Sequence, residues 1–409
     1  MKRELDCNEI EEALLSPEFF ANPYPFYQIL RSATPIYWSD KLGTWIFTRY
    51  SDCVSGLRDP SLLSNAGRMT ALLDQLPEAA RQNLGLLYEH YSAGLIFSDP
   101  PDHTRLRALV NKAFTPAVVE GLRPRIQEIV EELIDGVQYR GTTDIIGDLA
   151  YPLPAMLISE LFELPPRDRD QFRIWSEDII ALLGAGADAA RAERGQRSLR
   201  ALREYFVGLI AQRRHKPDSD VISALIAARE QGDRLSEAEL LSTCVTLLTA
   251  SQETTTNLIG NGVLALLRNP DQLEKLRDDP SLITTAVEEL LRYDAPLQRA
   301  LRRVTETFEV DGERIEKGEL VSLMLGAANR DPNQFPDPDR LNISRQENRH
   351  IGFGYGIHFC LGGPLARIEG QIAISALLRR LPSLRLASEE LEWRQDVSVR
   401  GLRALPVVF

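Results

Sequence analysis

The stretch FGYGIHFCLGG, Phe353 to Gly363, places one cysteine among four glycines. Cys360 is followed by LGGPLARIEGQIAISALLRRL, whose apolar spacing is typical of a helix. A helix N-terminus stabilises a thiolate, because its free N–H groups and dipole favour negative charge, and a thiolate is a soft ligand suited to iron. The stretch therefore predicts a metal-binding thiolate at the start of a helix. The alternative is a buried, inert cysteine, since free cysteine often packs as a small hydrophobe.

The glycines of this stretch favour the first interpretation. Gly354 and Gly356 permit a tight backbone bend, and Gly362 would let a flat macrocycle approach the helix closely. Backbone N–H groups beside Gly362 could also donate hydrogen bonds to the sulfur. A dinucleotide-binding loop is a poor match, because these glycines do not form a GxGxxG motif that opens a helix after a strand.

Composition excludes several other classes of protein. The 409 residues carry a net charge of -12, which argues against a nucleic-acid binder, and 44% are hydrophobic, so a large core can form. The N-terminal segment MKRELDCNEIEEALLSPEFF has no long apolar run, so neither a signal peptide nor a membrane anchor is expected. The four cysteines lie too far apart for a zinc motif. We expect a cytoplasmic protein.

Helical periodicity dominates the chain, and strand signals are few. The segment PIYWSDKLGTWIFTRYSD predicts a hairpin around Gly43, and FEVDGERIEKGELVSLML and VSVRGLRALPVVF predict two further β regions. Helical patterns are expected over 116–139, 199–214, 237–267 and 281–293. The sequence thus predicts a mainly α fold with a small β part, in one domain over 1–409, with β-rich portions at about 35–60, 305–325 and 385–409.

The longest predicted helix, 237–267, has an unusual centre. It opens with Ser236 and Glu239 in the spacing of a capping box, and its ends are apolar. Polar residues nevertheless fill its middle, from Thr249 to Asn257. A buried glutamate such as Glu253 costs desolvation unless it is paired or solvated. The centre is therefore either a solvated face or the wall of an internal reaction site.

The cysteine stretch closely resembles the haem-binding loop of the cytochrome P450 family. The pattern F-G-x-G-x-H-x-C-x-G is filled by Phe353, Gly354, Gly356, His358, Cys360 and Gly362. The segment EELLR is similar to the family's E-x-x-R motif, which implies that Glu289 and Arg292 form its buried structural ion pair. The spacing alone would fit a surface salt bridge equally well.

Further segments resemble the family in the same order along the chain. ASQETT resembles its oxygen-activation segment, which implies catalytic roles for Glu253 and Thr254, with Ala250 against the haem. Ser251 stands where the family usually has glycine. DPPDHTRLR is similar to its haem-propionate clamp. That likeness, with two further matches, implies these propionate partners: His103, Arg107, Arg302 and His358.

The resemblance implies a triangular, helix-rich fold around haem b, with Cys360 as the iron ligand. It implies a haem-thiolate monooxygenase that inserts one oxygen atom from O2 into a C–H bond, or epoxidises an alkene, of a lipophilic small molecule. Glu253 would relay protons and Thr254 would hydrogen-bond the oxygen, with Ser251 near their path. The implied substrate pocket contains Leu95, Ile96, Thr246, Thr249, Leu297 and Val399.

Electrons are expected from a separate ferredoxin or flavodoxin with its NAD(P)H reductase, and a monomer is expected. The partner would dock on the cysteine side, where Arg105, Lys112 and Arg367 offer positive charge, unless they only form a solvated face. Two other functions stay open at this point. One is a peroxide-driven hydroxylase on the same fold, and the other is a haem protein that binds a ligand or transfers electrons without oxygenation. The substrate could also be free or tethered to a carrier protein.

Overall fold

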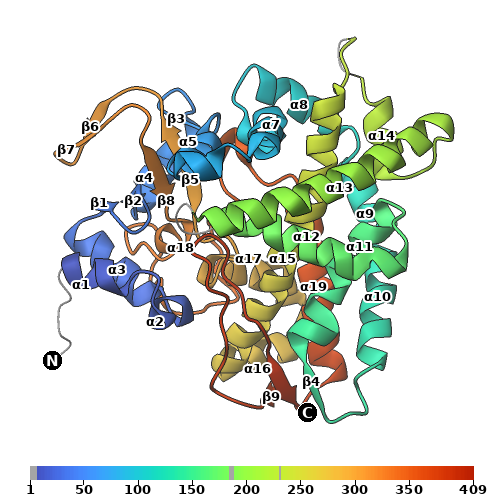
Figure 1. Cartoon of the computed structure of the whole chain (residues 1–409). Helices are drawn as coiled ribbons and strands as arrows, with labels where there is room; N and C mark the ends of the chain where they lie inside the picture. Colours follow the sequence, from blue (N-terminus) through green and yellow to red (C-terminus); the bar gives the residue numbers. More distant parts are fainter. Residues whose placement is uncertain (1–6, 184–187, 230–231) are drawn as a thin grey trace.

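The computed structural model describes residues 7–183, 188–229 and 232–409. The expected mainly helical fold with a small β part is confirmed (Figure 1). Most strands lie on the left of Figure 1 with the N-terminal helices, and the long helices fill the right. The helices are α1 (Cys7–Ala13), α2 (Pro17–Ala21), α3 (Tyr24–Ala33), α4 (Tyr50–Arg58), α5 (Arg68–Asp74), α6 (Glu78–Arg81), α7 (Gly85–Ala93), α8 (Asp102–Asn111), α9 (Pro116–Gly121), α10 (Arg123–Asp135), α11 (Pro152–Leu161), α12 (Arg169–Ile180), α13 (Ala189–His215), α14 (Val221–Ala227), α15 (Glu237–Arg268), α16 (Pro270–Asp278), α17 (Ile283–Tyr293), α18 (Leu325–Ala328) and α19 (Gly363–Arg380).

The strands form a five-stranded sheet in the order β1-β2-β8-β5-β3, a three-stranded sheet in the order β4-β10-β9, and the hairpin β6-β7. Within the first sheet β2 and β8 are parallel and the other neighbours antiparallel. The strands are β1 (Ile36–Ser39), β2 (Thr44–Phe47), β3 (Leu63–Ser64), β4 (Thr142–Asp144), β5 (Ala300–Val304), β6 (Phe308–Val310), β7 (Glu313–Ile315), β8 (Leu320–Leu323), β9 (Arg385–Leu386) and β10 (Pro406–Val408). Strands occur in each range expected, but β3, β4 and β5 lie outside those ranges, and 50–58 is helical.

The local signals explain most of these boundaries. Gly43, at φ +60°, turns the chain between β1 and β2, as the hairpin pattern predicts. The capping box of Ser236 and Glu239 is present at the start of α15. The helix expected over 116–139 is instead two helices, α9 and α10. Pro124 lies in the first turn of α10, where the backbone N–H that proline lacks would have no partner within the helix, so a new helix begins there.

Helix α15 joins two apolar cores. Its first half contributes Leu240 and Leu248 to the core beneath α7, α8 and α13. Its second half contributes Leu258 and Val263 to the core shared with α10, α17 and α19. At about 1.5 Å per residue its 32 residues span roughly 48 Å. The polar residues of its centre therefore lie where the two apolar cores separate.

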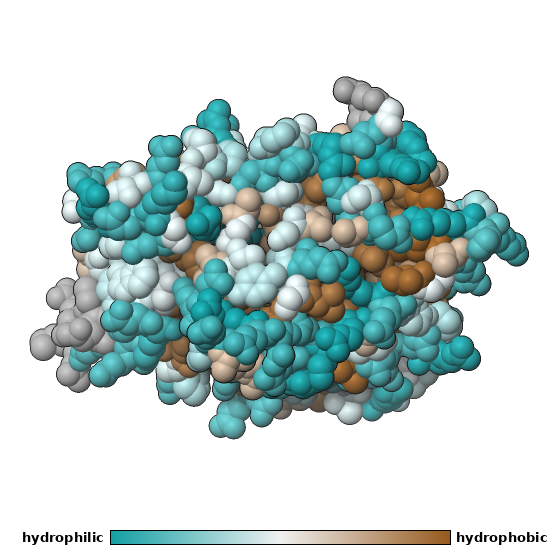
Figure 2. Space-filling view, turned by 45° about the horizontal axis from the view of Figure 1, so that its top comes forward, coloured by the Kyte–Doolittle hydropathy of each residue, from teal (hydrophilic) through white to brown (hydrophobic). Residues whose placement is uncertain are grey.

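The surface is largely hydrophilic, in keeping with the charge of the chain. Figure 2 shows apolar areas gathered at the right of the view, the side on which Figure 1 draws α13 and α14. Val118 of α9 and Val207 of α13 are among the exposed apolar side chains. Across the described ranges, no helix combines the length and the apolar character needed to cross a membrane.

Candidate active site around Cys360

The loop that carries Cys360 is a tight glycine bend ahead of α19. Gly354 and Gly356 have φ of +74° and +72°, and a short 3-10 turn, Gly356–His358, follows. The Cys360 N–H donates to the carbonyl oxygen of Phe353 at 3.0 Å. A Cβ on Gly356 would lie 2.8 Å from the carbonyl oxygen of Leu57, so a larger residue does not fit there. Helix α19 begins at Gly363, so the cysteine precedes its first residue instead of starting the helix.

The Cys360 thiol differs from the other cysteine thiols in its surroundings. Burial raises its pKa, whereas the N–H groups of Gly362 and Gly363 and the guanidinium of Arg107 act in the opposite direction. Cys53 and Cys244 are completely buried, and burial raises the pKa of both. Cys360 is thus a partly exposed thiol with donors placed to stabilise its thiolate.

Buried cationic and imidazole groups gather next to this loop. The rings of His103 on α8 and His358 lie 4.1 Å apart between centroids. Neither ring nitrogen of His103, and not Nε2 of His358, has a hydrogen-bond partner among the described residues. Arg302 on β5 is buried and donates to the adjacent Leu301 carbonyl. Burial lowers the pKa of His103 to about 4 and that of Arg302 to about 9.

Arg68 on α5 joins the same cluster, although it belongs to no recognisable sequence motif. It is buried, and burial lowers its pKa to about 10. It donates to the carbonyl oxygens of Ile96 at 3.1 Å and Leu301 at 3.3 Å, and its Nε has no partner in the described part of the chain. Arg68 is found only through the tertiary structure, because 30 positions, 69 to 98, separate it from its nearest sequence motif, DPPDHTRLR at 99–107.

Asp99 supplies the one carboxylate that faces this cluster within the described ranges. It accepts hydrogen bonds from the Ser64 hydroxyl and from the N–H groups of Asn65 and Ala66, and it lies 4.0 Å from Nε2 of His358. Burial opposes its ionisation, but these donors and His358 hold its pKa well below the usual range. With its oxygens already engaged, Asp99 leaves most of the surrounding positive charge uncompensated.

Three neighbouring arginines, at positions 299, 302 and 303, follow α17, and the structure separates their roles. Arg299 is bonded to the hydroxyls of Ser398 and Ser322, away from the cluster. Arg303 is exposed and lies beside Gly67. Only Arg302 of the three is buried next to Arg68 and Asp99. The alternation of side chains along β5 therefore turns Arg302 inward and Arg303 outward.

The centre of α15 faces the same region. Ala250 is exposed, although the residues before and after this segment of the helix are buried. The hydroxyl of Thr254 donates to the carbonyl oxygen of Ala250 at 2.9 Å, and that of Ser251 donates to Leu248 at 3.1 Å. These bonds to the preceding turn satisfy both hydroxyls without breaking the helix. An exposed alanine at the middle of a core helix marks a hollow beside it.

Glu253 takes part in an ion-pair network that the sequence did not predict. Its Oε1 lies 3.2 Å from Nη1 of Arg394, and Nη2 of the same arginine lies 3.2 Å from Oε1 of Glu177 on α12. Burial raises the pKa of Glu253 to about 7, with Asp396 and Glu177 acting in the same sense and Arg394 against them. Glu253 is therefore an acid that can hold or release a proton near neutral pH.

The residues expected to line a substrate pocket come from three separate segments. Leu95 and Ile96 lie on a 3-10 turn, Leu95–Phe97, that follows α7. Thr246 and Thr249 are on α15, the first one turn before Ala250 and the second directly before it. Leu297 and Val399 pair across an isolated β-bridge. Leu95, Thr249 and Val399 are buried and the other three half-buried.

The arginines and the lysine expected to attract a redox partner already have protein partners. Arg105 pairs with Asp233 and Glu239. The ammonium group of Lys112 donates to the carbonyl oxygen of Arg229. Arg367 forms a two-pronged pair with Glu288, with N–O distances of 2.6 and 2.9 Å. The charges of Arg105 and Arg367 are thus compensated by carboxylates, and Lys112 is hydrogen-bonded to a neutral carbonyl group.

Glu289 and Arg292 form a fully buried, two-pronged ion pair on α17, with N–O distances of 2.8 and 2.9 Å. Arg345 adds a second arginine, 3.1 Å from Glu289. Arg292 also donates to the carbonyl oxygens of Asn329 and Pro338. The pair therefore joins α17 to the long segment that leads to the Cys360 loop.

These residues fit the haem expected from the resemblance. A thiol with backbone donors suits the iron, and the buried donors of His103, His358 and Arg302 suit two propionate groups. A Cβ built on Gly362 meets no atom within 4 Å, so there is open space beside this residue, two positions after Cys360. No group of three or more His, Cys, Asp or Glu side chains in the described ranges is arranged to hold a bare metal ion.

Comparison with known proteins agrees with this geometry. The family model for "Cytochrome P450" matches residues 190–392. Cytochrome P450 107B1 of Saccharopolyspora erythraea is 45% identical over 369 residues, which cover 90% of this chain and 89% of that protein. The vitamin D(3) 25-hydroxylase of Pseudonocardia autotrophica is 42% identical, covering 97% of this chain and 96% of that one. The structure of P450BioI in complex with an acyl carrier protein ligated to hexadec-9Z-enoic acid superposes with a TM-score of 0.88 at 40% identity, over 96% of this chain and 99% of that one. Because relatives at 40% identity or more cover nearly the whole length, the chain belongs to the cytochrome P450 family and is a haem-dependent monooxygenase.

Proposed function

We propose that Cys360 is the proximal iron ligand of haem b, and that His103, Arg107, Arg302 and His358 hold its two propionates. The observation that carries this proposal is the adjacent ring pair His103–His358 beside buried Arg302. Neither nitrogen of His103 nor Nε2 of His358 has a hydrogen-bond partner among the described residues, and Arg302 donates to a backbone carbonyl oxygen. Gly362 and Ala250 would lie against the two faces of the ring. Phe353 and Gly354 would shape the loop, with the Phe353 ring under the guanidinium of Arg367 at 4.5 Å.

When bound, thiolate-ligated haem supplies O2 activation and transfer of one oxygen atom to a C–H bond or an alkene. We propose that the chain contributes proton delivery through Glu253 and Thr254. Glu253, poised near neutral pH, would hold a proton taken from solvent. Thr254 would accept it at its hydroxyl and donate towards the oxygen, exchanging its present bond to Ala250. Ser251, one turn away on the same helix, would add a second hydroxyl to this path.

The proposed substrate is a free, lipophilic small molecule held by Leu95, Ile96, Thr246, Thr249, Leu297 and Val399. These side chains are apolar or hydroxylic, which suits an apolar molecule with some polar decoration. The name of the 25-hydroxylase relative, which acts on vitamin D(3), supports a substrate of this class. Turnover of a carrier-bound but not a free substrate would contradict the proposal.

Electrons would reach the site from a separate ferredoxin or flavodoxin with its NAD(P)H reductase. We propose docking on the face of the Cys360 loop, where Tyr355 and Phe359 are large exposed aromatic residues. Arg105, Lys112 and Arg367 are paired within the chain, so they would add less attraction than free charges. The single domain, the monomeric state and the cytoplasmic location expected from the sequence stay predictions.

The test is the absorption spectrum of the dithionite-reduced, carbon monoxide-bound protein. A strongly red-shifted Soret band is expected, because a thiolate ligand would donate enough electron density to the iron to produce it. Cys360→Ala and Cys360→His should remove the band. Cys53→Ala, at a buried cysteine whose thiol donates to the carbonyl oxygen of Phe47, is the matched control and should keep it. A red-shifted band that survives in Cys360→His would overturn the assignment of the ligand.

A further inference from the structure

Glu253, the proposed proton donor, is bonded to Arg394, which lies 141 positions further along the chain. Arg394 reaches Glu253 with Nη1 and Glu177 with Nη2, both at 3.2 Å, so one guanidinium bridges two carboxylates on α15 and α12. Its Nε is buried and has no hydrogen-bond partner among the described residues. Arg394 therefore has no other acceptor that would draw it away from the two glutamates.

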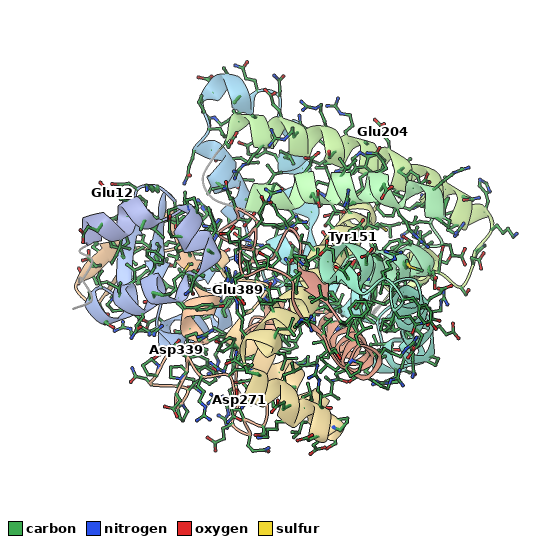
Figure 3. The ribbon with its side chains drawn as sticks, turned by 90° about the horizontal axis from the view of Figure 1, so that it is seen from below. Glu12, Tyr151, Glu204, Asp271, Asp339 and Glu389 are labelled. Atoms are coloured by element: carbon green, nitrogen blue, oxygen red, sulfur yellow. The ribbon has the colours of Figure 1, made fainter. Side chains whose placement is uncertain are left out.

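The backbone around Arg394 is fixed against α15. The Arg394 N–H donates to the carbonyl oxygen of Gly401 at 2.9 Å, and Trp393 pairs with Leu402 across a β-bridge. Gly401 packs so tightly that a Cβ there would lie 1.9 Å from the side-chain oxygen of Asn257, one turn after Glu253. The arginine is thus carried by a rigid turn seated on the oxygen-activation helix. Figure 3 shows Glu389, at the start of this segment, near the middle of the underside of the molecule.

Exposure increases along the network from the core to the surface. The side chain of Glu253 is 14% exposed, that of Arg394 28% and that of Glu177 42%. Glu177 therefore meets solvent, whereas Glu253 faces the interior. Because an arginine stays protonated at all ordinary pH values, Arg394 cannot itself pass a proton on. Its contribution must come from its charge and its position.

We propose that Arg394 is a positioning residue for proton delivery, which holds the Glu253 carboxyl and shares its charge between Glu253 and Glu177. This inference rests on the proposed role of Glu253. The charged groups that act on Glu253 are Arg394 and Asp396 from the C-terminal segment and Glu177 from α12. Removing Arg394 takes a positive charge away from Glu253. Removing Glu177 takes a negative charge away, so that the guanidinium of Arg394 pairs with Glu253 alone. The two substitutions should therefore shift the proton affinity of Glu253 in opposite directions.

The direct test is an infrared pH titration of the resting holoenzyme, which follows the protonated-carboxyl band that is lost in Glu253→Gln. We expect its midpoint near neutral pH in the parent protein. The midpoint should rise by about one pH unit in Arg394→Gln, the lower end of the effect of an opposite charge at this distance. The midpoint should fall in Glu177→Gln and return towards the parent value in the double variant. In Arg394→Lys, which keeps the positive charge, it should equal the parent value. The amount of product formed per NAD(P)H should fall as pH rises, and in each variant the midpoint of this fall should equal the infrared midpoint.

The matched control is Arg125→Gln. Arg125 also bridges two carboxylates, Glu128 and Glu160, but at the surface of α10 and α11. That variant should leave both the infrared midpoint and the product yield unchanged. Each variant is first checked for an unchanged carbon monoxide spectrum, so that misfolding is recognised.

The outcomes separate this inference from the proposed function. If Glu253→Gln keeps the parent product yield and its pH dependence, the proposed role of Glu253 is wrong. If the product yield of Glu253→Gln no longer falls at alkaline pH, the role of Glu253 stands. If Arg394→Gln and Glu177→Gln then leave the infrared midpoint in place, or shift it in the same direction, the inference about Arg394 is wrong.

Discussion

Glu369 is a carboxylic acid enclosed in the second apolar core. It is 2% exposed, and its Oε1 has no hydrogen-bond partner in the described part of the chain. Burial raises its pKa to about 8, against about 4.3 for an ordinary glutamate. The folded protein therefore holds this proton over a range in which the unfolded chain has released it. The free energy of unfolding must fall as pH rises from about 4 to 8.

Substitution of this single residue tests that account. Glu369→Gln removes the titration, so we expect the variant to be more stable than the parent at pH 8, by on the order of 2 kcal/mol, and to lose the advantage near pH 5. Thermal unfolding of both proteins across this range measures the difference. Glu389→Gln, at an exposed carboxyl labelled in Figure 3, is the control and should leave the pH dependence unchanged. An equal stability difference at pH 5 and pH 8 would contradict the linkage.

At the scale of elements, the buried pair on α17 fixes the path of the chain towards the haem loop. Arg292 is bonded to Glu289 and to carbonyl oxygens of the segment after α18. Arg292→Gln should lower the free energy of unfolding by about 3–5 kcal/mol, because it removes the buried two-pronged partner of the Glu289 carboxylate, which keeps Arg345, and leaves these carbonyls buried without their donor. Urea unfolding measures the loss. Arg125→Gln breaks a two-pronged pair at the surface and should cost less than about 1 kcal/mol. Similar losses in the two variants would show that burial of the pair does not matter.

At the scale of the whole molecule, the proposed propionate site brings together α5, α8, β5 and the Cys360 loop. Like charges there repel one another unless an anion lies between them. Arg302→Gln is therefore expected to raise the melting temperature of haem-free protein and to lower that of haem-loaded protein. Each change should correspond to on the order of 1 kcal/mol. Calorimetry of both forms measures the two changes in melting temperature. A change of the same sign in both forms would exclude a role for Arg302 in holding the propionates.

Local signals in the sequence identified much of the fold. The hairpin about Gly43 and the cap of α15 at Ser236 depend on neighbours a few residues away, so they could be read directly. The short strands β3 and β5 could not, because β3 forms only by pairing with β5, whose residues follow it by more than 200 positions, and β5 is completed by its other neighbour, β8. The break between α9 and α10 was missed because the apolar spacing continues through Leu122.

For the site, the sequence by itself determined which chemistry is present: a single cysteine in a glycine bend, and an acid next to an alcohol on a long helix. Those residues are recognisable because their roles require fixed spacings along the chain. Only the tertiary structure decided which arginine of three turns inward, that Arg68 and Asp99 join it, and that Arg394 bridges Glu253 and Glu177. The physical reason is that electrostatic interactions depend on distance in space, and side chains far apart in the sequence become neighbours only when the apolar cores on either side of α15 have packed.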